Sequence, residues 1–157
     1  MEKIMVTIET PKGSNAKYHY DASTNSFHLK KLLPVGMCFP YDFGFVPETK
    51  GGDGDPVDAL VISETGTFPG CKIECRLIGA LLAEQHTGRK KVRNDRLFFV
   101  PEESILFEGI PTIHGLPRTH LKQLEDFFVA YNKSEGKIFK PIKTIGSTAA
   151  LELLHKQ

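Results

Sequence analysis

The sequence has no tryptophan, only three cysteines among 157 residues, and no hydrophobic run long enough to span a membrane. The cysteines, Cys38, Cys71 and Cys75, are odd in number and form no C-x-x-C pair, which argues against a disulfide framework or a thiolate zinc site. The first residues also lack the apolar stretch of a secretory signal. These absences favour a cytoplasmic protein with reduced thiols and no membrane partner.

A strong charge of one sign is also missing. The chain has 20 basic and 19 acidic residues and a formal net charge of +1, so no overall field favours nucleic acid as a partner. Its six histidines show no H-E-x-x-H or similar spacing. With 40% apolar residues, the length suits one globular domain, residues 1–157, that buries a substantial core.

The most informative segment is the acidic run 51–58, Gly-Gly-Asp-Gly-Asp-Pro-Val-Asp, which leads directly into the apolar stretch 59–62. Its three carboxylates, Asp53, Asp55 and Asp58, have no basic residue between them and repel one another unless water or a cation separates them. The glycines permit positive φ and the proline restricts its neighbour. A bend before Asp58 can therefore bring all three carboxylates to one point beside a buried strand.

Two interpretations of this acidic corner stay open from the residues alone. A solvated Asp/Gly/Pro turn is the commonest use of these residue types. A site for a hard cation, Mg²⁺, Mn²⁺ or Ca²⁺, is the alternative that the oxygen ligands favour. An EF-hand loop is excluded, because Asp58 stands where that loop requires glycine.

The remaining pattern predicts an α+β fold. Segments rich in β-formers and separated by turn residues predict strands at 4–9, 16–21, 27–31, 71–82 and 97–100. Apolar residues at helical spacing after Pro117 predict a helix that ends near Gly136: Leu121, Leu124, Phe127, Phe128 and Tyr131. Ser147 is predicted to cap a final helix. We expect a small, strongly bent sheet or barrel with two helices packed against it.

Five basic residues gather between positions 84 and 96, near the tip of a predicted hairpin. We interpret Arg89, Lys90 and Lys91 as solvated. Arg96 adjoins the apolar strand 97–100 and is the better candidate for binding an anion.

The segment 53–61 matches the D-x-D-P-x-D signature of soluble family I inorganic pyrophosphatases, which the chain resembles over nearly its whole length. Further matches follow in the same order and with similar spacing: Ile8-Glu9, Lys17-Tyr18, Phe39-Pro40, Gly44-Phe45, Gly79, Val100-Pro101, Phe127-Phe128 and Tyr131. The resemblance implies an OB-like five-stranded β-barrel with two helices, a cytoplasmic homo-oligomer (commonly a hexamer in bacteria) and Mg²⁺-dependent hydrolysis of pyrophosphate to two phosphates, with Mn²⁺ as a second candidate ion.

The resemblance also implies roles for individual residues. Asp53 and Asp58 would be metal ligands, Asp55 the base that takes a proton from the attacking water, and Glu9 a ligand for an additional metal. Lys17 would hold a phosphoryl oxygen, and Tyr131 would donate its hydroxyl to the phosphate. Lys31 and Arg96 align with further substrate-binding positions, and Asn94 aligns with a metal-binding acid. If the alignment shifts by one residue, Asp95 takes the place of Asn94 as the metal ligand.

Several positions depart from the family pattern. His19, Gln85 and Asn94 stand where the family has acids, Phe43 replaces a tyrosine, Lys31 an arginine and Asn132 a lysine. A neutral amide oxygen can ligate Mg²⁺ but cancels no charge, so we expect fewer tight metal sites than a full family member has. Two alternatives follow: a pyrophosphatase-fold protein that binds phosphate or nucleotide without efficient turnover, and a hydrolase of another phosphoanhydride.

Overall fold

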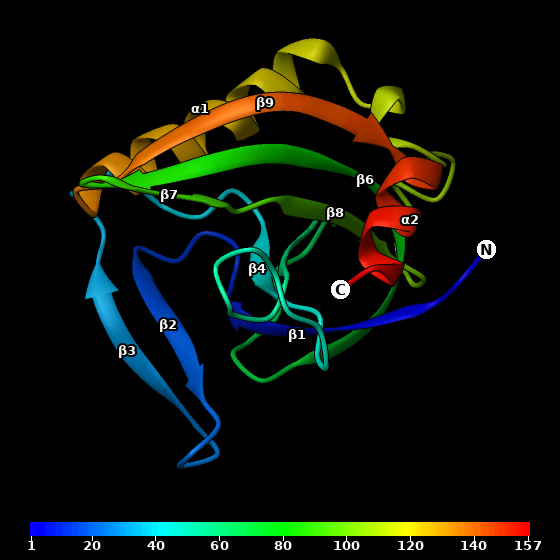
Figure 1. The fold of residues 1–157 in the computed structure, drawn as a ribbon. Helices are drawn as coiled ribbons and strands as arrows, with labels where there is room; N and C mark the ends of the chain where they lie inside the picture. The colour runs from blue at the N-terminus through cyan, green and yellow to red at the C-terminus, as the bar shows by residue number, and fades with distance from the viewer.

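The computed structural model describes residues 1–157 and is built around a closed ring of five strands (Figure 1). Around the ring, each strand pairs with the next and the last pairs with the first: β1 (Ile4–Thr10), β4 (Asp42–Phe45), β5 (Asp58–Val61), β8 (Arg96–Pro101) and β6 (Lys72–Thr87). Only the β5–β8 pair is parallel. The ring confirms the expected OB-like barrel.

Four further strands lie outside the ring. The long β6 also pairs with β7 (Lys90–Arg93) in a hairpin and with β9 (Ile138–Gly146) along its outer edge. A separate hairpin, β2 (Ala16–Asp21) and β3 (Ser26–Leu32), projects away from the barrel at the lower left of Figure 1. Its register shifts between Lys17 and Tyr18, a bulge that the sequence pattern did not predict.

Two α-helices pack against the sheet, as expected. Helix α1 (Arg118–Ser134) lies along β9, and α2 (Ser147–His155) packs on β6; a short 3₁₀ helix, η1 (Ile113–Gly115), precedes α1. The prediction that Ser147 caps α2 is wrong: Ser147 is the first helical residue, Gly146 is the cap, and no side chain caps the helix. No helix is both long enough and apolar enough to cross a membrane.

Side chains that alternate along the strands fall into two hydrophobic cores, one on each face of the sheet. In β5, Ala59 and Val61 face the barrel interior, which α2 closes with Ala150 and Leu154. The alternate residue, Leu60, belongs to the second core, between the outside of the sheet and α1. This second core is rich in aromatic rings, among them Phe39, Phe43, Phe98, Phe128 and Phe139. Its aromatic edge forms one wall of the site described next.

Candidate active site

The acidic corner is a compact loop held by its own backbone. The amide of Gly51 donates to the carbonyl oxygen of Asp55 at 2.7 Å, and that of Gly54, at φ +90°, donates to Gly51 at 3.1 Å. Gly52 packs so closely on the end of β7 that a Cβ there would lie 2.8 Å from the carbonyl oxygen of Arg93. The glycines therefore make the sharp loop possible, and Asp58 enters β5 directly after it.

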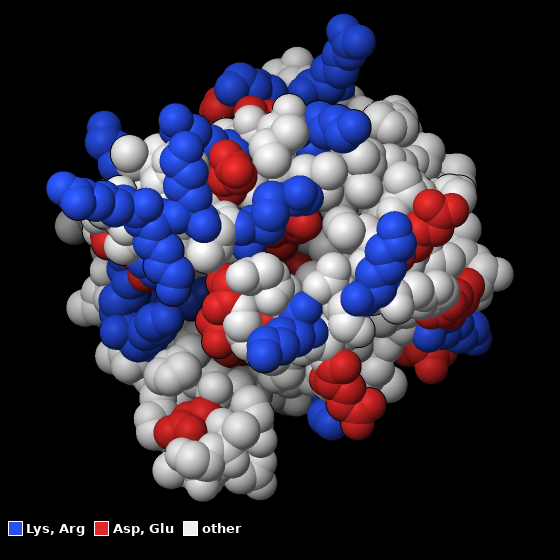
Figure 2. All heavy atoms as spheres, viewed as in Figure 1, with Lys and Arg blue, Asp and Glu red and all other residues white.

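Beside this loop the protein forms a cavity of about 730 Å³. In Figure 2, Asp and Glu atoms lie in a hollow near the centre of the face, with Lys and Arg side chains around it. The cavity brings together Glu9, Lys17, Asp53, Asp55, Asp58, Asn94, Arg96 and Tyr131 from the predicted site, and also His19, Phe43, Gln85 and Asn132. Five of the six positions that depart from the family pattern thus line the same cavity as the retained residues; the exception is Lys31.

Four carboxylates form the acidic wall of the cavity: Asp53, Asp55, Asp58 and Glu9. Burial raises the pKa of Asp53, and the charges of Asp58 and Asp55 raise it further. Burial likewise raises the pKa of Glu9, although Lys17 opposes the shift; the Glu9 carboxylate accepts a hydrogen bond from the Tyr20 amide at 2.8 Å. Such a wall is stabilised by a cation.

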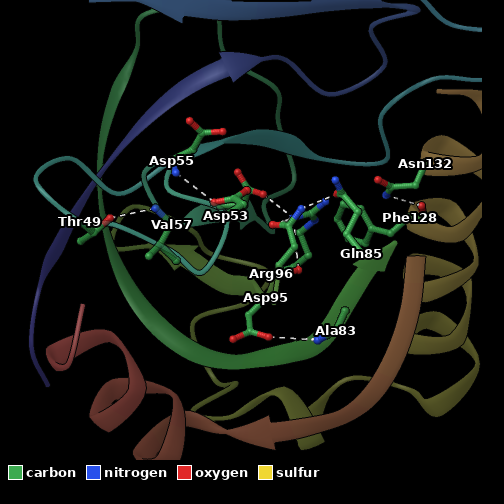
Figure 3. A network of polar contacts seen from close by, with 12 residues as sticks. Thr49, Asp53, Asp55, Val57, Ala83, Gln85, Asp95, Arg96, Phe128 and Asn132 are labelled. Carbon is green, nitrogen blue, oxygen red and sulfur yellow. Dashed lines mark hydrogen bonds and ion pairs between the residues drawn. The ribbon is translucent and has the colours of Figure 1, made fainter. Parts of the chain in front are cut away.

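The three carboxylates of the corner do not meet at one point, contrary to the expectation from the bend. Asp53 accepts a hydrogen bond from the Asp55 amide at 3.1 Å (Figure 3), and the Asp55 residue is exposed. Asp58 forms an ion pair with Arg96 instead. No three carboxylate, imidazole or thiol groups in the chain stand in an arrangement that would hold a metal ion. The physical reason is local: a neighbouring amide and a buried guanidinium offer the carboxylates closer partners than one another.

Lys17 stands in an aromatic box on another side of the cavity. Its ammonium nitrogen lies 4.7 Å from the ring centre of Phe43, 5.5 Å from that of Tyr131 and 5.7 Å from that of Phe39. The residue is only 8% exposed, yet its ammonium group donates no hydrogen bond and pairs with no carboxylate within 4 Å. Burial lowers the pKa of Lys17, and Glu9 opposes this shift. Lys17 is therefore a buried cation with free donors in the cavity wall.

Arg96 is the second buried cation, at 3% exposure. Its guanidinium carbon lies 5.2 Å from the ring centres of Phe128 and Phe139 and 5.7 Å from that of Phe43. One terminal nitrogen donates to the carboxylate of Asp58 and, at 2.5 Å, to the side-chain oxygen of Asn94. The Phe43 ring thus lies within 6 Å of both cations, a role that its place in the sequence did not indicate.

The two amides that replace acids are engaged with each other. The side-chain nitrogen of Asn94 donates to the side-chain oxygen of Gln85 at 2.7 Å, while the Asn94 oxygen accepts from Arg96. Asp58, Arg96, Asn94 and Gln85 thus form one chain of polar contacts along the cavity wall. The side-chain oxygen of each amide therefore already accepts one hydrogen bond.

Two predicted site residues lie elsewhere. Asp95 binds the side chain of Arg93 at 3.0 Å and accepts from the Ala83 amide at 3.1 Å, so its carboxylate points away from the cavity (Figure 3). Lys31 lies 5.3 Å from the ring centre of Tyr131 and donates to Ser134 outside the cavity wall.

The cavity also contains cations that the sequence did not single out. Lys30, Lys90 and Lys137 line it from three different elements or their ends. Alternation along β3 does not distinguish Lys30 from Lys31, because Lys30 is the extra residue of the bulge that interrupts this alternation. Lys90 was interpreted as solvated, since nothing local distinguishes it from Lys91.

Within the cavity, the acidic wall presents the oxygen ligands that a hard divalent ion prefers. Asp53, Asp55, Asp58 and Glu9 offer only oxygen ligands, and burial, which raises the pKa of Asp53 and Glu9, leaves their carboxylates with few water molecules to solvate them. The side of the cavity around Arg96 is less suited to such an ion, because it presents a guanidinium and two neutral amides whose oxygens each already accept one hydrogen bond.

An OB-like barrel whose cavity holds carboxylates beside buried cations defines a class of site: one for a small, multiply charged oxyanion accompanied by a hard cation. Comparison with known proteins gives a consistent result. The profile of the family described as inorganic pyrophosphatase matches residues 6–157. The chain is 37% identical over 151 residues to an inorganic pyrophosphatase of Methanosarcina acetivorans, covering 96% of this chain and 88% of the relative.

A second relative, from Streptomyces coelicolor, is 39% identical over 146 residues, covering 92% of this chain and 87% of its own length. Among solved structures, the inorganic pyrophosphatase of Thermus thermophilus superposes with a TM-score of 0.90 at 32% identity, covering 98% of this chain and 88% of that one. The chain belongs to the inorganic pyrophosphatase family.

Proposed function

We propose that this protein hydrolyses inorganic pyrophosphate to two phosphates in the 730 Å³ cavity, with a divalent cation. The observation that carries the proposal is the pair of buried cations, Lys17 and Arg96, facing the carboxylates of the acidic corner. Pyrophosphate has no apolar part, so charge and hydrogen bonds must supply its binding energy. The family membership supports this choice of substrate.

Three residues bind the substrate in this proposal. Lys17 holds a phosphoryl oxygen through its free N–H groups, and the caged Arg96 offers a charge of fixed position. Tyr131 donates its hydroxyl, because burial and the nearby Glu135 raise its pKa and keep it protonated. Lys31, whose ammonium lies over the Tyr131 ring, contributes a charge from outside the wall.

Asp55 is the proposed general base. It is the exposed member of the three acids, and its carboxylate makes no hydrogen bond, so it can accept a proton from an attacking water. Asp53, Asp58 and Glu9 on the acidic wall would turn toward a common Mg²⁺, or Mn²⁺ in its place, because the three carboxylates do not converge in this structure. When bound, such an ion supplies charge neutralisation and polarises the phosphoryl group.

Phosphate release from pyrophosphate tests the proposal. Wild type and Asp55→Asn are compared with Mg²⁺ or Mn²⁺ present and with both ions chelated. We expect turnover only for wild type with a divalent ion, and a loss on the order of 100-fold in Asp55→Asn. Equal rates in the two proteins would reject Asp55 as the base. No turnover by the wild type, together with phosphate or nucleotide binding, would instead indicate a binding protein.

We also propose a cytoplasmic homo-oligomer, with a hexamer as the expected form. Large apolar side chains remain exposed on β3, the turn that follows it and a later loop: Leu29, Leu32, Val35, Ile105 and Leu106. The free thiols of the three cysteines agree with a reducing compartment. Light scattering on the purified protein would give the mass, and a monomer would reject the oligomer.

A further inference from the structure

The ion pair between Arg96 and Asp58 places a permanent positive charge on a proposed metal ligand. A guanidinium does not lose its proton in a protein, so this charge is present at every working pH. Arg96 is also unable to move aside easily, because Phe43, Phe128 and Phe139 surround it at 5.2 to 5.7 Å. A cation that approaches Asp58 therefore meets a fixed cation already in contact with that carboxylate.

The amides extend this effect along the wall. Asn94 accepts from Arg96 and donates to Gln85, so the chain orients the guanidinium toward Asp58. Within the protein, Arg96 has no second carboxylate to share its charge with, since its only ion pair is with Asp58. The wall as a whole acts as a built-in countercharge to the acidic corner.

We propose that Arg96 competes with the divalent cation for Asp58, so that the protein without substrate binds this cation weakly. The inference rests on the proposed function, because it assumes that the acidic wall is the cation site. It deepens that function by naming a residue of this chain that sets the affinity for the ion. It also implies that an anionic substrate, by placing its negative charge beside Arg96, offsets the charge of the guanidinium and raises the affinity for the cation.

Binding of Mn²⁺ to the substrate-free protein tests the competition. Electron paramagnetic resonance measures the free ion, and wild type is compared with Arg96→Gln, Arg96→Lys and a matched control, Arg93→Gln. Arg93→Gln removes the same charge as Arg96→Gln, but the ion-pair partner of Arg93, Asp95, lies outside the cavity. Circular dichroism confirms that each variant is folded, and Arg96→Lys keeps a cation in the aromatic cage if Arg96→Gln does not fold.

We expect Arg96→Gln to bind Mn²⁺ at least about tenfold more tightly than wild type, from the typical strength of a charge-assisted hydrogen bond. Arg96→Lys should fall between them, since it keeps the charge but cannot bridge Asp58 and Asn94. Arg93→Gln should stay within about twofold of wild type. Structural damage alone would weaken binding, so a gain identifies the competition.

A double variant, Arg96→Gln with Asp58→Asn, should lose the gain. Unchanged or weaker Mn²⁺ binding in Arg96→Gln, or no binding in any protein, would overturn the inference. Pyrophosphate turnover by wild type is measured separately: turnover without the affinity gain rejects the competition alone, whereas the gain without turnover rejects the proposed function alone.

Discussion

Replacement of Lys17 by methionine should make the protein more stable and less active at the same time. Lys17 is 8% exposed, its ammonium lies against the Phe43 ring at 4.7 Å, and no carboxylate pairs with it. Methionine has a similar volume and removes the buried charge. From comparable replacements of buried ions by apolar residues, we expect a gain of roughly 1 kcal/mol in the free energy of unfolding.

The effect on activity should have the opposite sign. Loss of a charged hydrogen bond to a phosphoryl oxygen costs about 1.5–3 kcal/mol, so kcat/KM for pyrophosphate should fall on the order of 10- to 100-fold. A residue whose role is only to support the fold would lower both quantities when it is replaced. Chemical denaturation and phosphate release on the same preparations measure the two effects.

The stability difference should also depend on pH. Because the folded-state pKa of Lys17 is lowered, the unfolded chain binds its proton more readily, and the charge costs stability at neutral pH. This cost disappears as the pH rises through the lowered pKa toward 10.5, the ordinary value of lysine. Lys17→Met should therefore lose its advantage between neutral and alkaline pH. A destabilised Lys17→Met, or an advantage that grows with pH, would refute the reasoning; Lys91→Met, on the exposed hairpin, should change stability by less than about 0.5 kcal/mol.

Other predictions concern the frame of the site. Glu64 accepts hydrogen bonds from the turn 104–106, and these lower its pKa to about 2. Wild type should therefore be more stable than Glu64→Gln above pH 4.5 and should lose this advantage as the pH falls toward 2, which acid denaturation of both proteins would measure. A Cβ at Gly44 would lie 1.9 Å from a carbonyl oxygen of β1, so Gly44→Ala should unfold at a markedly lower temperature, and an unchanged melting temperature would contradict the close packing. Exposed Cys38 should react with an alkylating reagent at pH 8, whereas Cys75, whose pKa burial raises to about 12, should react only after unfolding, as mass spectrometry of the labelled peptides would show.

Local pattern was enough to predict most of the frame. Helix α1 follows from the spacing of its apolar residues, and β5 follows from the apolar run after the acidic corner. The barrel could be expected only through the family resemblance, because the closing β1–β6 pair joins segments about 70 positions apart. The prediction that Ser147 caps α2 was wrong because a serine at the start of a helix fits the sequence pattern whether or not its hydroxyl forms a hydrogen bond with the backbone.

The acidic half of the site was visible in the sequence, but its partners were not. Repulsion among close carboxylates can be recognised from six residues, whereas the ion pair of Asp58 with Arg96 joins two strands that meet only in the fold. The cage around Arg96 takes rings from β4, α1 and β9. For the same reason the choice between Asn94 and Asp95 needed the structure, which turns Asp95 toward Arg93.

Anomalous diffraction from crystals soaked with Mn²⁺ and phosphate tests the central claim most directly, since it locates cation and anion in one map. We predict manganese on the oxygens of the acidic wall, about 2.1–2.2 Å from a carboxylate, with phosphate in contact with Lys17 and Arg96. Manganese bound between Gln85 and Asn94, or phosphate bound outside the cavity, would contradict it.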